Sequence, residues 1–313
     1  MRDGKASIGV ALRDPVPWPE LRDIVESAEE TGYAAVFVPE IVWREAFSTL
    51  AALTSVTTSA LLGTGVVAMT HRDEFTTALA AATLHDLSDG RFVLGLGAGE
   101  ERRLAHVRSY VEDVSRLLRG EAAGGRALGA APEPKATPIW LAALGPSMVE
   151  LAGEVANGAL LNWCTPERVA RAREEVTRGA ERAGRDPAAV TIAVYVRTCL
   201  GQEEAHALAV LRAAAGEYAT MPRYRRQLES MGLVEEAAAA AAAFGSGDPS
   251  GVPRRLVDEL CLWGDRDAAL RRLHAYHDAG ADLVVVYPVP VRDRVSSILG
   301  SLMALAPAPA VER

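Results

Sequence analysis

Short runs of apolar, often β-branched residues alternate along the chain with longer segments that carry apolar residues at helical spacing. The apolar runs predict eight strands, at residues 7–12, 34–38, 61–67, 91–97, 139–143, 158–162, 190–196 and 282–287. Strands that are apolar along their whole length are typical of a parallel sheet covered by helices. Nearly every predicted strand is followed by a helical segment, and eight such units favour a closed barrel over an open sheet. The pattern therefore predicts an α/β fold, a (β/α)8 TIM barrel.

Helix boundaries can be read from the residues that interrupt the pattern. A helix predicted over residues 19–31 ends at Gly32, and one over residues 75–87 runs into the turn 88–90, which reads Ser-Asp-Gly. Glycine is the usual residue just past a helix end, because it tolerates the left-handed backbone found there. One further helix is predicted from about residue 105 to residue 118.

The segment 203–262 is longer than one strand-to-strand connection requires. It contains an alanine run at 237–243 and a glycine-rich stretch at 245–251, so we expect inserted helices and a flexible loop before the last strand. The proline- and alanine-rich end, residues 307–313, is predicted to be a disordered tail. Residues 1–306 then form a single domain, since one α/β barrel commonly spans about 250 residues or more.

Composition and charge exclude several classes of partner. The 313 residues are 49% hydrophobic and carry a formal charge of −8, with no basic stripe that would favour nucleic acid or an anionic membrane. No apolar run approaches the roughly 18 residues of a membrane helix, and the apolar stretch near the start is too short for a signal peptide. Cys164, Cys199 and Cys261 are far apart, which indicates neither a disulfide framework nor a zinc site. These features predict a cytoplasmic protein.

Glycines gather where the predicted strands end, which is where TIM barrels place their active sites. The ends read Gly-Thr-Gly-Val at 63–66, Gly-Ala-Gly-Glu at 97–100 and Leu-Gly-Pro-Ser at 144–147. Glycine lets a flat ring or a phosphate approach the backbone closely. The turn at 144–147 also opens a helix, whose free N–H groups favour an anion. The alternative is that these glycines only make tight turns between strands and helices.

Two acids also end predicted strands and are candidates for proton transfer. Glu40 follows the second strand and Glu100 the fourth. A carboxyl group that is partly shielded beside a cofactor can serve as proton donor or acceptor. The alternatives are a solvated acid and, for Glu100, a partner of a helix N-terminus beside Glu101.

Other motifs point away from rival chemistries. The glycines at 95, 97 and 99 do not form the G-x-G-x-x-G fingerprint of dinucleotide-binding proteins. The third glycine is missing at the required spacing, where Glu100 or Arg102 stands. His274 and His277 are three residues apart on a predicted helix with no third ligand nearby, so no metal site is expected. The chain contains no G-x-S-x-G, P-loop or H-E-x-x-H motif, and the sequence gives hydrolase and kinase functions no support.

Two long blocks resemble a known family. Residues 83–99, TLHDLSDGRFVLGLGAG, and residues 138–166, which open with PIWLAALGP, are similar to the signature of the luciferase-like monooxygenases. The second block is especially similar to the branch that uses coenzyme F420, which includes methylene-tetrahydromethanopterin reductase. The resemblance runs from Ile8 to about Pro288.

The resemblance implies a cofactor site at the ends of the strands. It implies a non-proline cis peptide at Gly65–Val66 behind the ring system, a phosphate-binding turn at 144–147, and an acid at Glu40. Glu100 is similar to an acid of deazaflavin sugar-phosphate dehydrogenases and would be the proton donor. The implied cofactor contacts are Glu40, Gly65, Val66, Val67, Ala98, Gly99, Leu144, Gly145, Pro146, Ser147, Leu161 and Asn162. A homodimer is implied as well.

The sequence departs from the family pattern at several positions. Ile41 stands where several members have histidine, and residues 71–73 read His-Arg-Asp in place of Arg-His-Pro. Asn157 replaces a common aspartate. The stretch between residues 100 and 138 is short where many relatives carry a roof over the substrate pocket. We therefore expect an open barrel mouth, which suits a large substrate but could equally mark weakened cofactor binding.

The function implied is hydride transfer between reduced coenzyme F420 and an electrophilic C=C, C=N or C=O group of a small or larger substrate. The cofactor would carry the hydride on ring carbon C5, and the protein would contribute positioning and a proton. One alternative is an FMN-dependent monooxygenase that uses oxygen. Another is a non-catalytic barrel that acts as a binding or partner subunit.

Overall fold

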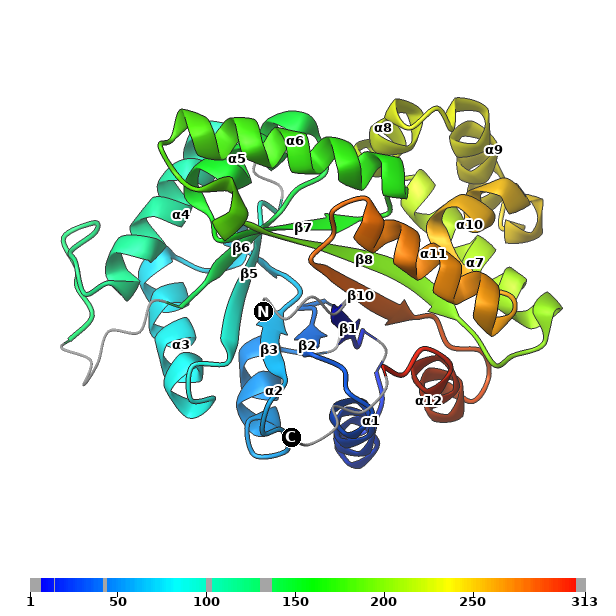
Figure 1. Cartoon of the computed structure of the whole chain (residues 1–313), viewed down its shortest axis with the longest axis horizontal. Helices are drawn as coiled ribbons and strands as arrows, with labels where there is room; N and C mark the ends of the chain where they lie inside the picture. The colour runs from blue at the N-terminus through cyan, green and yellow to red at the C-terminus, as the bar shows by residue number, and fades with distance from the viewer. Residues whose placement is uncertain (1–6, 14, 42–43, 100–102, 130–136, 308–313) are drawn as a thin grey trace.

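A closed, parallel barrel forms the centre of the computed structural model, which describes residues 7–13, 15–41, 44–99, 103–129 and 137–307. Its strands are β1 (Ser7–Ala11), β2 (Ala35–Val38), β3 (Leu61–Thr64), β4 (Val67–Ala68), β5 (Phe92–Gly97), β6 (Ile139–Ala142), β7 (Gly158–Asn162), β8 (Thr191–Cys199) and β10 (Leu283–Pro288). The last of these pairs with both β1 and β8 and so closes the ring (Figure 1). Because β4 continues β3 along the edge of β5, the barrel has the eight positions predicted from the sequence.

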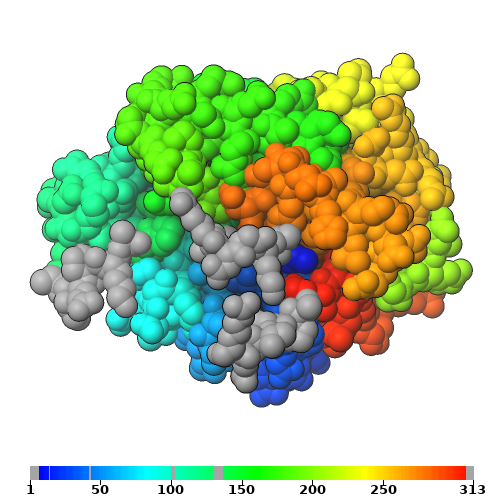
Figure 2. Space-filling view, viewed as in Figure 1, coloured from blue at the N-terminus to red at the C-terminus, as the bar shows by residue number. Residues whose placement is uncertain are grey.

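Helices surround the barrel on its outer side (Figure 1). They are α1 (Trp18–Glu30), α2 (Ala46–Leu53), α3 (Glu74–Leu87), α4 (Leu104–Leu118), α5 (Pro146–Val155), α6 (Pro166–Arg182), α11 (Arg266–Asp278) and α12 (Arg294–Ala304). Figure 2 shows α12, in red, beside α1, in blue. There the hydroxyl of Tyr33, just after α1, donates to the carbonyl of Leu302 at 2.9 Å. The first and last helices therefore complete the ring together.

The segment between β8 and β10 contains the predicted inserted helices. They are α7 (Glu204–Ala219), α8 (Pro222–Ser230), α9 (Val234–Gly245) and α10 (Arg254–Leu260). They enclose a hydrophobic core of their own, which includes Trp163 and Cys199 from the barrel. This core joins the insertion to the ends of the barrel strands.

The barrel interior is filled unevenly. Phe37 packs against Trp140 and Tyr195, with ring centroids 5.8 and 5.7 Å apart. Gly63 faces these rings, and a Cβ atom there would collide with the ring of Phe37. Small residues on β3 thus make room for large aromatic side chains from other strands, which is how the interior reaches close packing.

The structure differs from the sequence prediction at three places. The predicted strand 61–67 is split into β3 and β4 around Gly65 and Val66. The predicted helical insertion, residues 203–262, ends in an additional strand, β9 (Cys261–Trp263), which pairs with the end of β8. The stretch 245–251, predicted as a loop, contains the end of α9 and a 3-10 helix (Pro249–Gly251). Three residues directly after a helix are too few to show a strand pattern.

Candidate active site at the barrel mouth

The carboxyl ends of the parallel strands form one end of the barrel, here called the mouth. Of the predicted site residues, the structure brings Glu40, Gly65, Gly99, Leu144 and Asn162 to this end, because each follows or ends a strand. Glu100, the predicted proton donor, lies outside the described residues.

The peptide bond Gly65–Val66 is cis, which confirms the prediction for this bond. The backbone N–H of Glu40 donates to the carbonyl of Val66 at 3.3 Å, so the acid after β2 and the cis peptide are neighbours. The hydroxyl of Tyr195 lies where a side chain at position 65 would be, and it is buried with no hydrogen-bond partner among the described residues. Burial raises the pKa of Tyr195 well above its ordinary value, which keeps the hydroxyl protonated and able to donate.

Glu40 shares an arginine with a second acid. Arg72 donates from its two terminal nitrogens to Oε1 of Glu40 at 2.7 Å and to Oε1 of Glu45 at 2.6 Å. The other oxygen of Glu40 accepts from the backbone N–H of Ala46 at 3.2 Å. Both carboxylate oxygens of Glu40 are thus engaged in holding Arg72 and the start of α2.

Glu45 is the N-cap residue of α2, where its carboxylate accepts from the N–H groups of Phe47 and Ser48. Partial burial works to raise the pKa of Glu45, but the hydrogen bonds from Ser48 and Phe47 outweigh it, so this pKa lies below its ordinary value. Arg72 could not be predicted from the sequence, because its partners are two acids that precede it by about 30 residues.

The turn 144–147 leads directly into α5. Gly145 is the N-cap residue with extended backbone, Pro146 is the first helical residue, and no side chain caps the helix. Gly145, Pro146 and Ser147 are all exposed, and a Cβ at position 145 would meet no atom within 4 Å. The free N–H groups of the first turn are therefore accessible to an anion.

Three of the predicted contact residues direct their side chains away from the barrel interior. Val67, Ala98 and Leu161 belong to the hydrophobic core between the strands and the surrounding helices. Only their backbone atoms remain for a ligand at the mouth. Asn162, which comes next on β7, instead contacts residues of the mouth through its side chain.

A second missed residue, Arg197, is 2% exposed and lies near the end of β8. Its Nη1 donates to Oδ1 of Asn162 at 2.8 Å, and its guanidinium stacks on Tyr287, Trp163 and Tyr218. The sequence did carry a signal for it, a charged residue at the end of an otherwise apolar strand, on the same face as Tyr195.

The inserted helix α8 reaches across part of the mouth. Arg223 donates to the carbonyl of Gly99 at 2.7 Å, while Gln227 donates to the carbonyls of Asn162 and Trp163 at 2.7 and 2.6 Å. Tyr224, from the same helix, accepts from Nδ2 of Asn162 at 3.0 Å, and burial raises its pKa to about 12. The expectation of an open mouth is thus too simple, because the insertion covers the side between β5 and β7.

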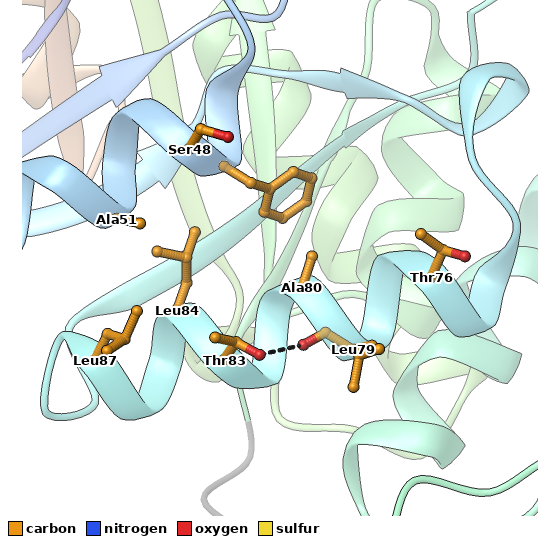
Figure 3. Close-up of a pocket in the computed structure, with 9 residues that line it drawn as sticks. Ser48, Ala51, Thr76, Leu79, Ala80, Thr83, Leu84 and Leu87 are labelled. Carbon is orange, nitrogen blue, oxygen red and sulfur yellow. Dashed lines mark hydrogen bonds between the residues drawn. The ribbon is translucent and has the colours of Figure 1, made fainter.

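A hollow elsewhere on the surface does not fit an active site. It has a volume of about 380 Å³ and lies between α2 and α3 on the outside of the barrel (Figure 3). Its lining includes Phe47, Leu79, Leu84 and Leu87 and no ionisable side chain. The strand ends, with their polar and charged groups, are the better candidate for an active site than this apolar hollow.

Other candidate chemistries find no support in the described part of the chain. His71 is exposed, and the Nδ1–H of His277 donates to the carbonyl of Ala281 at 2.9 Å. Within the described ranges, no three His, Cys, Asp or Glu side chains come together in a way that could hold a metal ion. No helix of those ranges has the length and apolar character needed to cross a bilayer.

The residues at the mouth fit a flat ring that carries an anionic tail. An orphaned, buried hydroxyl lies beside Gly65, and a buried guanidinium lies further along the same strand face. The exposed start of α5 supplies N–H groups for a phosphate. A deazaflavin or flavin cofactor has both parts.

Comparisons with known proteins agree with this fit. A family model described as Luciferase-like monooxygenase matches residues 5–283. The chain belongs to this family. This luciferase-like chain is also similar to a 5,10-methylenetetrahydromethanopterin reductase of Archaeoglobus fulgidus, with 28% identity over 312 aligned residues. The alignment covers 88% of this chain and 92% of the relative.

Further matches concern the same branch. The luciferase-like chain is 27% identical to a putative coenzyme F420-dependent oxidoreductase of Mycobacterium tuberculosis, over 84% of this chain and 89% of that protein. A solved structure, the coenzyme F420-dependent tetrahydromethanopterin reductase of Methanopyrus kandleri, matches with a TM-score of 0.79 at 22% identity, covering 97% and 98% of the two chains. The structural match confirms the TIM-barrel fold, and the relatives show that the chain is an F420- or flavin-dependent oxidoreductase.

Proposed function

We propose that the protein is an F420-dependent reductase, which passes hydride to an electrophilic C=C, C=N or C=O group. The observation that carries this proposal is that the mouth combines an exposed, uncapped helix start at Gly145 with a buried, unpartnered hydroxyl of Tyr195 beside Gly65, which fits a phosphate and a flat ring. A relative and a solved structure that are named as coenzyme F420-dependent match over most of the chain and support the choice of cofactor.

In this proposal the mouth residues hold the cofactor in place. Gly65 and Val66 support the ring from behind, Glu40 and Asn162 lie along its edge, and Gly99 lets it approach the end of β5. Leu144, Gly145, Pro146 and Ser147 receive the phosphate at the start of α5. When bound, the deazaflavin supplies the hydride. Glu100 would supply the proton, so that the protein's share is positioning and proton transfer.

Titration of the purified protein with F420 and FMN, each oxidised and reduced, tests the proposal. We expect tight binding of F420, measured by calorimetry or by cofactor fluorescence, and much weaker binding of FMN. Tight binding of FMN without binding of F420, together with oxygen consumption, would indicate a monooxygenase and overturn the proposal. The deazaflavin lacks the ring nitrogen N5 that supports oxygen chemistry, so the two functions differ in their need for oxygen.

The homodimer that the resemblance implies remains a proposal of the same kind. Light scattering coupled to size exclusion would give the mass in solution, and a mass of about 33 kDa, that of one chain, would contradict it.

A further inference from the structure

We propose that Arg197 is an anion-binding residue of the mouth, which pairs with a planar organic oxyanion of the bound ligands. The proposal rests on the proposed function only in taking this end of the barrel as the ligand-binding end. The anion has two possible sources, a carboxylate of the substrate or negative charge on the cofactor, and both present the same chemistry to a guanidinium.

The position of Arg197 follows from strand geometry. Side chains alternate between the two faces of a strand, and Ala193 and Tyr195 of β8 lie in the core inside the barrel. Arg197 is the next residue on that face, and its register partner on β10 is Tyr287. The guanidinium therefore stands one layer above Tyr195, whose hydroxyl lies beside Gly65. This places a permanent positive charge between the cis peptide and the inserted helices.

The charge of Arg197 has no acidic counterpart among the described residues. Its one hydrogen-bond acceptor is the neutral amide of Asn162. The other neighbours are the faces of three aromatic rings. The Cζ atom of Arg197 lies 3.9 Å from the ring centroid of Tyr287, 4.7 Å from that of Trp163 and 5.0 Å from that of Tyr218. Aromatic faces attract a cation but offset only part of the loss of water. A buried arginine is ordinarily paired with an anion.

Two other arginines of the barrel, one buried and one half-buried, show the arrangement with a carboxylate. Arg168, 4% exposed, donates to Glu175 at 2.7 Å. Arg173, at the opposite end of the barrel, donates to Asp282 at 2.5 Å. Arg197 differs from both, because its surroundings supply a neutral amide and ring faces where the others have a carboxylate. A site built in this way favours an anion that arrives with a ligand.

The surroundings of Arg197 are held in place from two sides. Trp163 has a left-handed backbone, with φ at 51°, which bulky residues rarely adopt and which brings its ring over the guanidinium. Asn162 is fixed in turn by Tyr224 and Gln227 of α8. The indole nitrogen of Trp163 and Oε1 of Gln227 are buried with no partner among the described residues. Such unsatisfied polar groups, gathered around one cation, are typical of a binding site and uncommon in a structural core.

The competing explanation is that Arg197 has only a structural role, in which it holds the inserted helices α7–α10 against the barrel. The variant Arg197→Met distinguishes the two explanations, because it keeps the length of the side chain and removes the charge. The matched control is Arg173→Met, which removes an ion pair at the far end of the barrel and should lower the melting temperature without changing any ligand affinity. Arg197→Lys keeps the charge, so it tests the proposal if the methionine variant does not fold.

The first measurement is F420 affinity without substrate, by fluorescence titration. If the anion belongs to the cofactor, we expect Arg197→Met to weaken binding about 30-fold, Arg197→Lys to weaken it less, and Arg173→Met to have no effect.

The second measurement uses benzoate and its neutral analogue benzamide as probes, with thermal shift as the readout. If the anion belongs to the substrate, benzoate but not benzamide should stabilise the wild-type protein in a saturable manner. Arg197→Met should lose this stabilisation and Arg197→Lys should weaken it. The F420 affinity of both variants should stay within about twofold of the wild-type value.

Variants that lose only thermal stability, with F420 affinity and the benzoate response both unchanged, would overturn the proposal and leave Arg197 with only a structural role. A wild-type protein that binds neither F420 nor FMN would contradict the proposed function instead. The benzoate measurement on the cofactor-free protein would still decide the role of Arg197.

Discussion

At the scale of single residues, Gly145 allows the phosphate turn to be tested without harming the fold. Its φ of −87° suits any residue, and a Cβ there meets no atom within 4 Å. Aspartate is also a better N-cap residue than glycine. We expect Gly145→Asp to keep or slightly raise the melting temperature and to weaken cofactor binding about tenfold or more, because its charge repels a phosphate at the start of α5.

Gly145→Asn is the matched control, since it caps the helix without a charge and should bind almost normally. Unchanged affinity in a folded Gly145→Asp variant would move the phosphate site elsewhere on the protein.

The two acids that follow the second and fourth strands predicted from the sequence are expected to have different roles. Glu100→Gln keeps the size of the side chain but removes the proton, so turnover should fall about 100-fold or more while cofactor affinity stays nearly unchanged. Glu40→Gln removes one side of the ion-pair network around Arg72 and should mainly alter cofactor affinity. Steady-state kinetics and cofactor titration of both variants separate binding from catalysis. The reverse result would exchange the roles, and two fully active variants would exclude both acids from catalysis.

How far the sequence could predict the site depends on how local each signal is. The glycine turn at 144–147 and the acid at Glu40 follow strands directly, so position alone placed them at the mouth. Arg72 and Arg197 escaped prediction because their partners come from distant segments, such as Tyr218 and Tyr287 around Arg197. The direction of the side chain of Leu161 also depends on strand register, which the apolar run at 158–162 does not reveal.

At the scale of secondary-structure elements, Glu29 ties α1 to the loop before β3. Its carboxylate accepts from the backbone N–H groups of Thr58, Ser59 and Ala60 at 2.7–3.0 Å. Partial burial works to raise the pKa of Glu29, but these hydrogen bonds outweigh it, so the pKa lies below its ordinary value of 4.5. A lowered folded-state pKa means that the stabilisation is complete above the unfolded-state pKa and is lost as the pH falls through the folded-state value.

Glu29→Gln should therefore lower the free energy of unfolding by about 1 kcal/mol at neutral pH, a modest value because the group is partly exposed. The difference from the wild-type protein should shrink below about pH 4.5, in urea unfolding curves recorded from pH 7 to pH 3. A difference that stays constant over this range would show that the charge of Glu29 is not involved. Glu30→Gln, next to it and exposed, is a suitable control.

The strand pattern was predictable because barrel strands are buried on both faces and therefore apolar throughout. β7 was predicted with the bounds that the structure has, and β1, β2, β5 and β10 with ends that differ by one residue. β9 was missed because its three residues follow α10 directly and are held by pairing with β8, which is a tertiary contact. The extension of β8 to Cys199 has the same cause.

At the scale of the whole molecule, the reactivity of the three cysteine thiols can be used to follow unfolding. Burial raises the pKa of Cys164 and of Cys261 to about 12, and that of Cys199 to about 11. Because the thiolate is the reactive form, none of the three should react with Ellman's reagent in the native protein at pH 8 within minutes. All three should react in guanidinium chloride. Rapid reaction of any thiol in the native state would contradict the burial described for it.

The same thiols distinguish the two cores. Cys164 lies in the core between barrel and helices, while Cys199 and Cys261 lie in the core around the insertion. Labelling at low denaturant, followed by mass spectrometry, would show whether the insertion opens before the barrel. Equal labelling rates at all three positions would indicate that the molecule unfolds as one cooperative unit.

The contact between Gly65 and Tyr195 restricts how this protein could change over generations. A methyl group at position 65 would collide with the hydroxyl of Tyr195, so any larger residue there is excluded while the tyrosine remains. Exchange of that tyrosine for phenylalanine removes the oxygen that stands closest, and only then does a side chain at position 65 become conceivable. The two positions are thus expected to vary together among descendants of this chain, and the order of the two substitutions matters, because only one of them is tolerable as the first step.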